Sequence, residues 1–332
     1  MSAIIFWLYI TKAIALFLQA GEATAAPPRV APPPLGKLVD AGGYRVHLYC
    51  TGSGSPTVVV VSGGFSFDWG LVQPAVAKFT RICTYDASGT AWSDSYPARQ
   101  PQQTDTAPDC ADRVAEIHTV LKNADISGPY LLVGFSIGGL IGRLYAREYP
   151  EDVAGMIIVD HAFIGMGSDV SPQSRVSSGP RESNGPKRST LAESVDSPPV
   201  FISGPPIALD LEDDRNFSKL PQLDQDLHRW AMSIHRLRPT VEAAAECFAA
   251  VEARTKDEPY PLGDRPLIVI RTNDRVAGYQ ELQTKLLLLS RNSKLVLAGN
   301  SSHMVIIDEP EVVIASIRQM VAALRNGTAL QQ

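Results

Sequence analysis

The sequence predicts an α/β fold in which a mostly parallel β-sheet is covered by helices on both faces. Three observations predict this fold class. Short apolar runs rich in β-branched residues, such as residues 57–61, are typical of strands that are buried on both faces. Amphipathic segments alternate with these runs along the chain. An antiparallel hairpin comes first, because Gly42-Gly43 separates two strand-like segments.

Length, charge and cysteine content exclude several classes of protein. The 332 residues suffice for two average domains, or for one large domain with an insertion. An apolar content of 45% and a charged content of 20% exclude a globally disordered chain. The net charge of −5, without any Lys/Arg run, indicates that nucleic acid is not a partner. The four cysteines are too few for a disulfide scaffold and lack zinc-site spacing, so we expect no bound metal.

The amino-terminal residues have the features of a targeting segment. Residues 3–20 are nearly all apolar, but they contain Lys12. A lysine at the centre of a membrane helix costs about 2.5–3.5 kcal/mol, which favours Lys12 as the charge that precedes a short apolar core. Ala23-Thr24-Ala25 then fits an A-x-A cleavage site. We expect residues 1–25 to be a signal peptide of an exported protein, either periplasmic or secreted. The alternative is a membrane anchor through residues 3–20, which would be the only membrane contact.

The remaining chain is divided into a linker, a core in two parts, an insertion and a tail. Residues 26–35 form a proline-rich linker. The core spans 36–161 and 263–326, and its strands are predicted at 37–41, 44–50, 57–61, 81–85, 130–133, 155–159, 267–270 and 294–297. Its helices are predicted at 109–123, 138–149 and 309–324. Between the two parts, residues 162–262 begin with a Ser-, Gly- and Pro-rich stretch and continue into helical segments. We expect a partly flexible lid there, and a tail at 327–332.

The chemistry centres on the motif Gly134-Phe135-Ser136-Ile137-Gly138. It follows a predicted strand and opens a predicted helix, which is the context of a nucleophile elbow. Such a sharp turn needs glycine on both sides and holds the serine hydroxyl at the carboxyl end of the sheet. The N–H of Ile137, at the start of the helix, points to the same space and can stabilise an oxyanion.

A serine nucleophile needs a base and a group that orients that base. His303 follows the last predicted strand and precedes the final helix, so it belongs to a loop at the same edge of the sheet. Two acids remain as candidates, Asp160 and Asp274. Asp160 is favoured because it directly follows a strand, whereas Asp274 lies in an arginine-flanked turn. The glycines of the loop at 62–65 predict the second oxyanion donor, with the N–H of Gly64 preferred over that of Phe65.

These residues carry a family resemblance that extends over residues 43–325. The segments GFSIGG, YDASGTAWSD and SSHMVIIDEPEVV resemble the nucleophile elbow, the segment after the fourth strand and the histidine region of α/β-hydrolases. The resemblance implies an eight-stranded sheet with the insertion as a lid, and it supports Asp160 as the acid. Phe135, Ser62 and Ala91 depart from residues that are common in the family. Because position 136 is Ser, branches with an Asp nucleophile, such as haloalkane dehalogenases and epoxide hydrolases, are disfavoured.

The resemblance implies hydrolysis of a carboxylic ester or a related acyl bond of a small-molecule substrate. We expect Ser136, His303 and Asp160 to act without any cofactor or metal. Two alternatives stay open: a ligand receptor that keeps the fold without catalysis, and perhydrolysis or cofactor-free haloperoxidase chemistry on the same three residues. In the implied sheet the strands of Cys50 and Cys83 are neighbours, so these residues form a candidate disulfide. Four buried thiols are the alternative.

Overall fold

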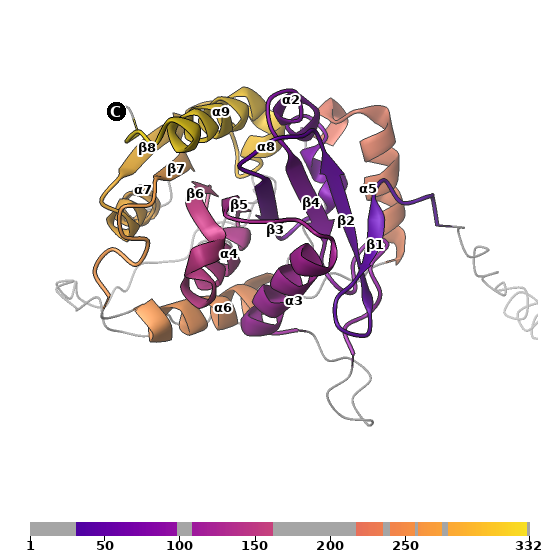
Figure 1. Cartoon of the computed structure of the whole chain (residues 1–332). Coiled ribbons are helices and arrows are strands. Elements are labelled where there is room, and N and C mark those ends of the chain that lie inside the picture. The colour runs from indigo at the N-terminus through magenta and orange to yellow at the C-terminus, as the bar shows by residue number, and fades with distance from the viewer. Residues whose placement is uncertain are drawn as a thin grey trace, which may run out of the picture. The chain divides into compact units, whose positions relative to one another are not determined.

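An eight-stranded sheet forms the centre of the protein (Figure 1). The computed structural model describes residues 31–97, 108–161, 217–234, 240–255, 258–273 and 278–330. The strand order is β1-β2-β4-β3-β5-β6-β7-β8, with β2 antiparallel to both of its neighbours and all other pairs parallel. This confirms the predicted mostly parallel sheet of eight strands. The strands are β1 (Lys37–Asp40), β2 (Arg45–Thr51), β3 (Val58–Ser62), β4 (Ile82–Asp86), β5 (Tyr130–Phe135), β6 (Val153–Val159), β7 (Leu267–Thr272) and β8 (Ser293–Ala298).

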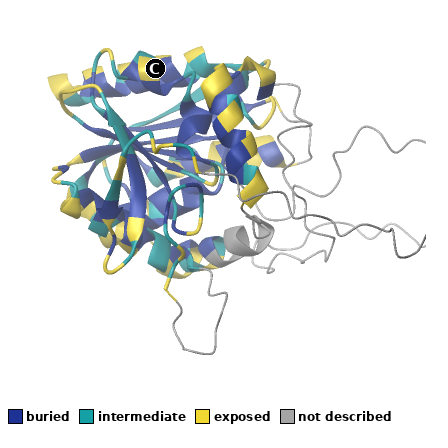
Figure 2. Cartoon of the chain, turned by 90° about the vertical axis from the view of Figure 1, so that its right-hand side faces the viewer, coloured by how far each residue is buried: buried dark blue, intermediate teal, exposed yellow. Residues whose placement is uncertain are grey.

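Two layers of helices cover the sheet, as the continuous apolar runs of its central strands require. One layer contains α3 (Cys110–Asn123), α4 (Gly138–Glu148) and α6 (Thr240–Thr255). The opposite layer contains α2 (Gln73–Val76), α8 (Val305–Asp308) and α9 (Pro310–Asn326). Figure 2 shows the result: the strands are buried between the layers, while the outer faces of the helices are exposed.

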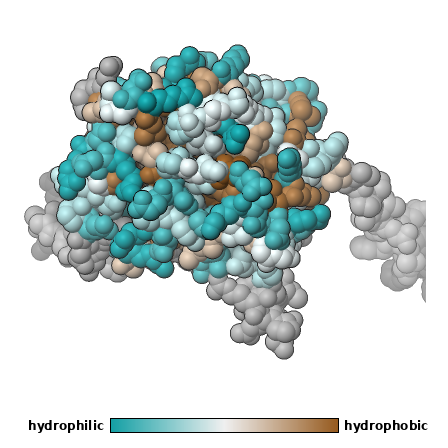
Figure 3. Space-filling model, in the orientation of Figure 1, coloured by the Kyte–Doolittle hydropathy of each residue, from teal (hydrophilic) through white to brown (hydrophobic). Residues whose placement is uncertain are grey.

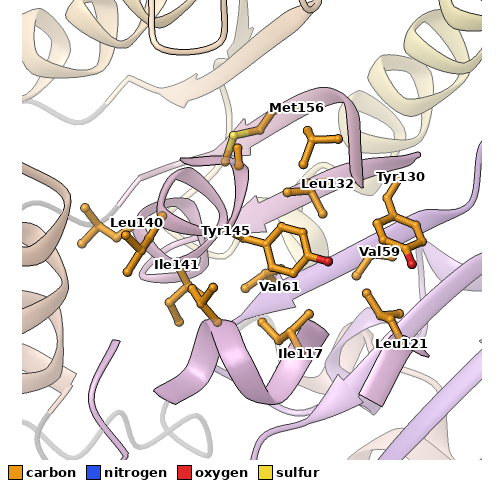
Figure 4. Packing of buried hydrophobic residues seen from close by; sticks show 14 of the residues in the cluster. Val59, Val61, Ile117, Leu121, Tyr130, Leu132, Leu140, Ile141, Tyr145 and Met156 are labelled. Carbon is orange, nitrogen blue, oxygen red and sulfur yellow. The ribbon is translucent and has the colours of Figure 1, made fainter. Parts of the chain in front are cut away.

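Alternate side chains of the central strands divide the apolar core between the two layers. On the first face, Val59 and Val61 of β3 and Leu132 of β5 pack against α3 and α4 (Figure 4). On the second face, Val60 and Val133 belong to the cluster that contains the residues of α8 and α9. Because successive side chains of a strand point to opposite faces, β3 and β5 are packed against helices on both faces. The loops that leave their carboxyl ends start from rigid elements.

The chain between β6 and β7 contains the predicted lid. Residues 162–216 of it lie outside the described residues, as does the predicted signal peptide. The described parts are η3 (Phe217–Lys219), α5 (Gln222–Ile234) and α6. Helix α6 packs against α3 and α4, whereas α5 packs against η1 (Ser66–Trp69), which follows β3. The predicted domain limits stay predictions. Among the described helices, none combines the length and the apolar character needed to cross a membrane.

Two disulfides link elements that are distant in the sequence. Cys50 and Cys83 face each other across β2 and β4 and are bonded. Cys110 and Cys247 join the start of α3 to α6. The first pair is the one that the sequence suggested, whereas nothing in the sequence indicated the second pair. The alternative of four buried thiols does not describe this structure.

Helix α5 buries an acidic side chain against the core. The carboxylate of Asp224 lies directly over Gly70, where any β-carbon would collide with it. Burial, together with the charge of Asp68 nearby, raises the pKa of Asp224 to about 6 from its usual 3.8. A raised pKa means that the folded protein resists ionisation of this group. Its charge therefore costs stability above pH 6, and this cost disappears as the pH falls toward 4. On the face drawn in Figure 3, hydrophilic side chains cover most of the surface, and apolar side chains gather in a few areas between them.

The variant Asp224→Asn should therefore be more stable than the wild type at neutral pH. We expect its free energy of unfolding to rise by about 1–2 kcal/mol at pH 7.5, and the gain to shrink toward zero by pH 4.5. Urea denaturation at the two pH values measures both numbers. Asp226→Asn is the matched control, because Asp226 is exposed on the same helix and pairs with Arg229. A gain that is equal at both pH values would contradict this assignment.

Candidate active site

Ser136 lies at the sharp turn between β5 and α4. Its φ of +55° is in the left-handed region, which is strained for a residue with a side chain. The turn is possible because its flanks are glycines: a β-carbon on Gly134 would lie 2.6 Å from the carbonyl oxygen of Gly138. A β-carbon on Gly138 would overlap the carbonyl oxygen of Val61 in β3. The Ser136 N–H donates to the carbonyl oxygen of Val159, 3.1 Å away.

His303 lies in the loop between β8 and α8, and its ring is between the side chains of Ser136 and Asp160. Its Nε2 is 2.9 Å from Ser136 Oγ, and its Nδ1 is 2.6 Å from Asp160 Oδ2. Because an ionised carboxylate only accepts hydrogen bonds, we assign the proton to Nδ1 and the lone pair to Nε2. Nε2 can then accept the proton of the serine hydroxyl. The His303 side chain is 42% exposed and that of Asp160 is 3% exposed, so the pair is open only on the histidine side.

Asp160 directly follows β6 and has a φ of +41°, a conformation that Asp tolerates better than most residues. Its Oδ1 accepts hydrogen bonds from the Thr272 backbone N–H at 3.3 Å, from the Thr272 hydroxyl at 3.2 Å and from the Tyr279 hydroxyl. Burial raises the pKa of Tyr279 and the charge of Asp160 raises it further, so the phenol stays protonated and donates. Gln283 in turn donates to the Tyr279 oxygen at 2.8 Å. These donors compensate for the burial of the carboxylate.

The loop that carries His303 is fixed by the helices that follow it. The Asn300 N–H donates to Glu309 at 2.9 Å, and Ser302 donates to Asp308 through both its N–H and its hydroxyl. The ring of Phe135 stacks on the ring of His303 with centroids 5.1 Å apart. The imidazole is therefore held by its loop, by Asp160 and by an aromatic face.

The second expected component of the oxyanion site is the loop after β3. A β-carbon on Gly63 would approach the Ile137 side chain to 2.7 Å, so this loop adjoins the start of α4. The Gly64 N–H donates to Ser62 Oγ at 3.1 Å. The Phe65 N–H donates to Asp68 Oδ2 at 2.8 Å, which commits it to the protein. Both N–H groups considered from the sequence therefore have acceptors within the loop, and the choice of Gly64 stays a prediction.

The structure thus brings together Ser136, His303 and Asp160, while the other candidate acid, Asp274, lies outside the described residues. Sequence reasoning missed Thr272, Tyr279 and Gln283. No sequence signal could have found them, because Tyr279 contacts Asp160 across 119 residues and neither lies in a recognisable motif.

Within the part of the chain that the structure describes, no three His, Cys, Asp or Glu side chains are grouped to hold a metal ion. The arrangement can move a proton from the Ser136 hydroxyl to His303.

The two candidate acids predict different effects on the reactivity of Ser136. Asp160→Asn keeps the shape of the side chain but removes the charge that orients His303, so labelling of Ser136 by a fluorophosphonate should slow by about 10³–10⁴-fold. Asp274→Asn should stay within about three-fold of the wild-type rate. Labelling time courses followed by intact mass spectrometry measure both rates. A normal rate in Asp160→Asn together with a slow rate in Asp274→Asn would reverse the assignment.

Comparisons with known proteins agree with this architecture. A family model described as "Alpha/beta hydrolase family" matches residues 58–316, which is more than half of the chain. An uncharacterised protein of Bacillus subtilis (strain 168), YqjL, is 24% identical over 89% of this chain and 96% of its own length. An uncharacterised protein of Schizosaccharomyces pombe is 31% identical over 35% of this chain, and the match spans only 26% of that protein. In structure, the chain is similar to a thermophilic esterase from Thermogutta terrifontis (TM-score 0.56, 16% identity, 88% of this chain and 99% of the other). The chain belongs to the alpha/beta hydrolase family.

Proposed function

We propose that this protein is a serine hydrolase that cleaves a carboxylic ester or a related acyl bond through an acyl-enzyme. Membership of the alpha/beta hydrolase family supports a hydrolytic function. The observation that carries the finer proposal is the continuous contact from Ser136 Oγ to His303 Nε2 and from His303 Nδ1 to Asp160. A serine next to a base that is itself oriented by a buried carboxylate has the arrangement of an activated nucleophile.

In the first half of the reaction, Ser136 Oγ attacks the carbonyl carbon of the substrate. His303 Nε2 takes the hydroxyl proton, and the resulting imidazolium is stabilised by the Asp160 carboxylate and by the face of Phe135. The carbonyl oxygen becomes an oxyanion that the N–H groups of Ile137 and Gly64 stabilise. His303 then gives its proton to the leaving alcohol as the carbon–oxygen bond breaks, which leaves the acyl group on Ser136.

In the second half, water replaces the alcohol. His303 takes a proton from the water as it attacks the acyl carbon, and the same two N–H groups stabilise the second oxyanion. The proton returns to Ser136 Oγ as the carboxylic acid leaves. Because the imidazole is partly exposed, water can reach its Nε2 side directly. The other oxygen of Asp160 is held by the Thr272 and Tyr279 donors, so the carboxylate keeps its orientation toward His303 through both halves of the reaction.

Ester turnover by the wild type and by Ser136→Ala tests this proposal. On p-nitrophenyl esters of graded chain length, we expect wild-type hydrolysis that falls by at least about 10³-fold in Ser136→Ala, since the acyl-enzyme cannot form. Thermal unfolding of the variant serves as the control for its fold. Tight binding of an ester without turnover by the wild type would favour a ligand receptor instead. Turnover that is unchanged in Ser136→Ala would refute the mechanism.

We propose in addition that the protein is exported. The apolar amino-terminal segment with its A-x-A sequence supports this proposal. The two disulfides support it independently, because such bonds persist in oxidising compartments and are rare in the cytosol. All four cysteines of the chain are used in these bonds.

Export predicts the thiol content and the amino terminus of the protein recovered from its native cells. Denatured, unreduced protein should show no free thiol by alkylation and mass spectrometry, and all 4 cysteines should react after reduction. The chain should begin at Ala26, as cleavage after Ala25 requires. An intact amino terminus in a membrane fraction would support the anchor alternative, and free thiols in the native protein would contradict an oxidising compartment.

A further inference from the structure

A buried hydrogen bond between a histidine and an aspartate connects α5 to the loop that follows β3. His228 Nδ1 lies 2.8 Å from Asp68 Oδ1, and the two side chains are 0% and 3% exposed. Asp68 belongs to η1, whereas His228 comes from the segment between β6 and β7, 160 residues away in the chain. Since the ionised carboxylate only accepts, Nδ1 of His228 donates. Nε2 of His228 has no hydrogen-bond partner among the described residues. Hydrogen bonding thus directs this side chain to Asp68 alone.

Aromatic rings fix the orientation of the imidazole. The rings of Phe65, Phe67 and Phe217 are in edge-to-face arrangement with it, with centroids 5.3, 6.2 and 4.9 Å away. Phe65 and Phe67 belong to the same short segment as Asp68, so the loop after β3 contacts His228 through two rings and a carboxylate. Packing and hydrogen bonding therefore hold the two elements together at one point.

The second carboxylate oxygen of Asp68, Oδ2, contacts the backbone of the loop after β3. Oδ2 accepts the Phe65 N–H at 2.8 Å. It also lies so close to Gly64 that a β-carbon there would be only 2.5 Å from it. Asp68 consequently fixes the peptide that joins Gly64 to Phe65. That peptide adjoins the Gly64 N–H, which the proposed mechanism assigns to the oxyanion.

We propose that His228 is a positioning residue for the oxyanion loop, which it holds through Asp68 so that the Gly64 N–H, bonded to Ser62 Oγ in this structure, stays close enough to exchange that acceptor for the reacting carbonyl oxygen. The inference rests on the proposed function and extends it to α5, an element that does not touch Ser136 in the described structure. His228 itself contacts no reacting atom. Without the His228 donor, Oδ1 of the buried Asp68 carboxylate would lose its hydrogen bond near the carboxylate of Asp224. Asp68 could then lower this energetic cost by changing rotamer, which would break its contacts with Phe65 and Gly64.

Two substitutions of His228 separate the hydrogen bond from mere packing. His228→Leu removes the donor, whereas His228→Asn places an amide N–H where Nδ1 lies and can keep the bond to Asp68. Active sites are counted with a fluorophosphonate, and kcat and KM for a p-nitrophenyl ester are expressed per titrated site. The inhibition constant of an alkyl boronic acid is measured as well, because its tetrahedral adduct with Ser136 directs an oxygen into the oxyanion site.

We expect His228→Leu to lower kcat per site by about 10–100-fold and to weaken boronic acid inhibition by a similar factor, while KM changes by less than about three-fold. His228→Asn should recover most of both losses. Leu227→Ala, a buried neighbour on the same helix, is the matched control. It should lower thermal stability but leave kcat per titrated site within about two-fold of the wild type.

Should His228→Leu yield no titratable protein, Asp68→Asn tests the same link with an isosteric side chain, and we expect the same loss of kcat and of boronic acid affinity. Wild-type values per site in His228→Leu, or in Asp68→Asn, would overturn the inference while leaving ester hydrolysis intact. An equal loss in Leu227→Ala would overturn it too, because the effect would then be general loosening of α5. A wild type that neither hydrolyses esters nor labels at Ser136 would overturn the proposed function, and this inference with it.

Discussion

The candidate site depends on how closely the start of α4 approaches β3. Gly138 lies so close to the carbonyl oxygen of Val61 that a β-carbon on Gly138 would overlap this oxygen. This contact bends the chain immediately after β5 and forces Ser136 into the left-handed region, with its hydroxyl above the edge of the sheet. The strain at Ser136 costs on the order of 1–3 kcal/mol. It is tolerated because β3 and β5 are packed on both faces and cannot relax around the turn.

The same rigid sheet sets the distance between the acid and the base. Asp160 is the first residue after β6, and its N–H still bonds to Ile270 of the neighbouring β7. The donors to its carboxylate come from the end of β7 and from α7 (Tyr279–Lys285). His303 leaves the next strand, β8, in a loop braced by Asp308. Three consecutive strands of the sheet therefore place the acid, its donors and the imidazole in one row at their carboxyl ends.

Sequence reasoning succeeded where the signal is local and failed where it depends on distant contacts. The strands of the core and the elbow around Ser136 were predictable, because continuous apolar runs favour buried strands and paired glycines around a serine favour a sharp strand-to-helix turn. The choice between Asp160 and Asp274 could only be weighted, since both follow strands. Tyr279, Asp68 and His228 were invisible, because a buried hydrogen bond between residues more than a hundred positions apart leaves no spacing to detect. The pairing of Cys110 with Cys247 was unreadable for the same reason.

The second disulfide offsets part of the conformational entropy that the long segment between β6 and β7 loses on folding. Because β6 and β7 are neighbours in the sheet, the chain between them is a long loop whose two ends are held together. Holding the ends of a long loop together costs conformational entropy on folding. Cys110 and Cys247 are 137 residues apart, and a cross-link of that span restricts the unfolded chain by roughly 4–5 kcal/mol in the loop-entropy model. The bond holds α6 on α3, at the end of the loop nearest to β7. At the other described end, α5 is held on η1 by packing and by the pair His228–Asp68. The covalent link therefore fixes α6 in the layer that supports Ser136, whereas α5 is held on the oxyanion loop by noncovalent contacts.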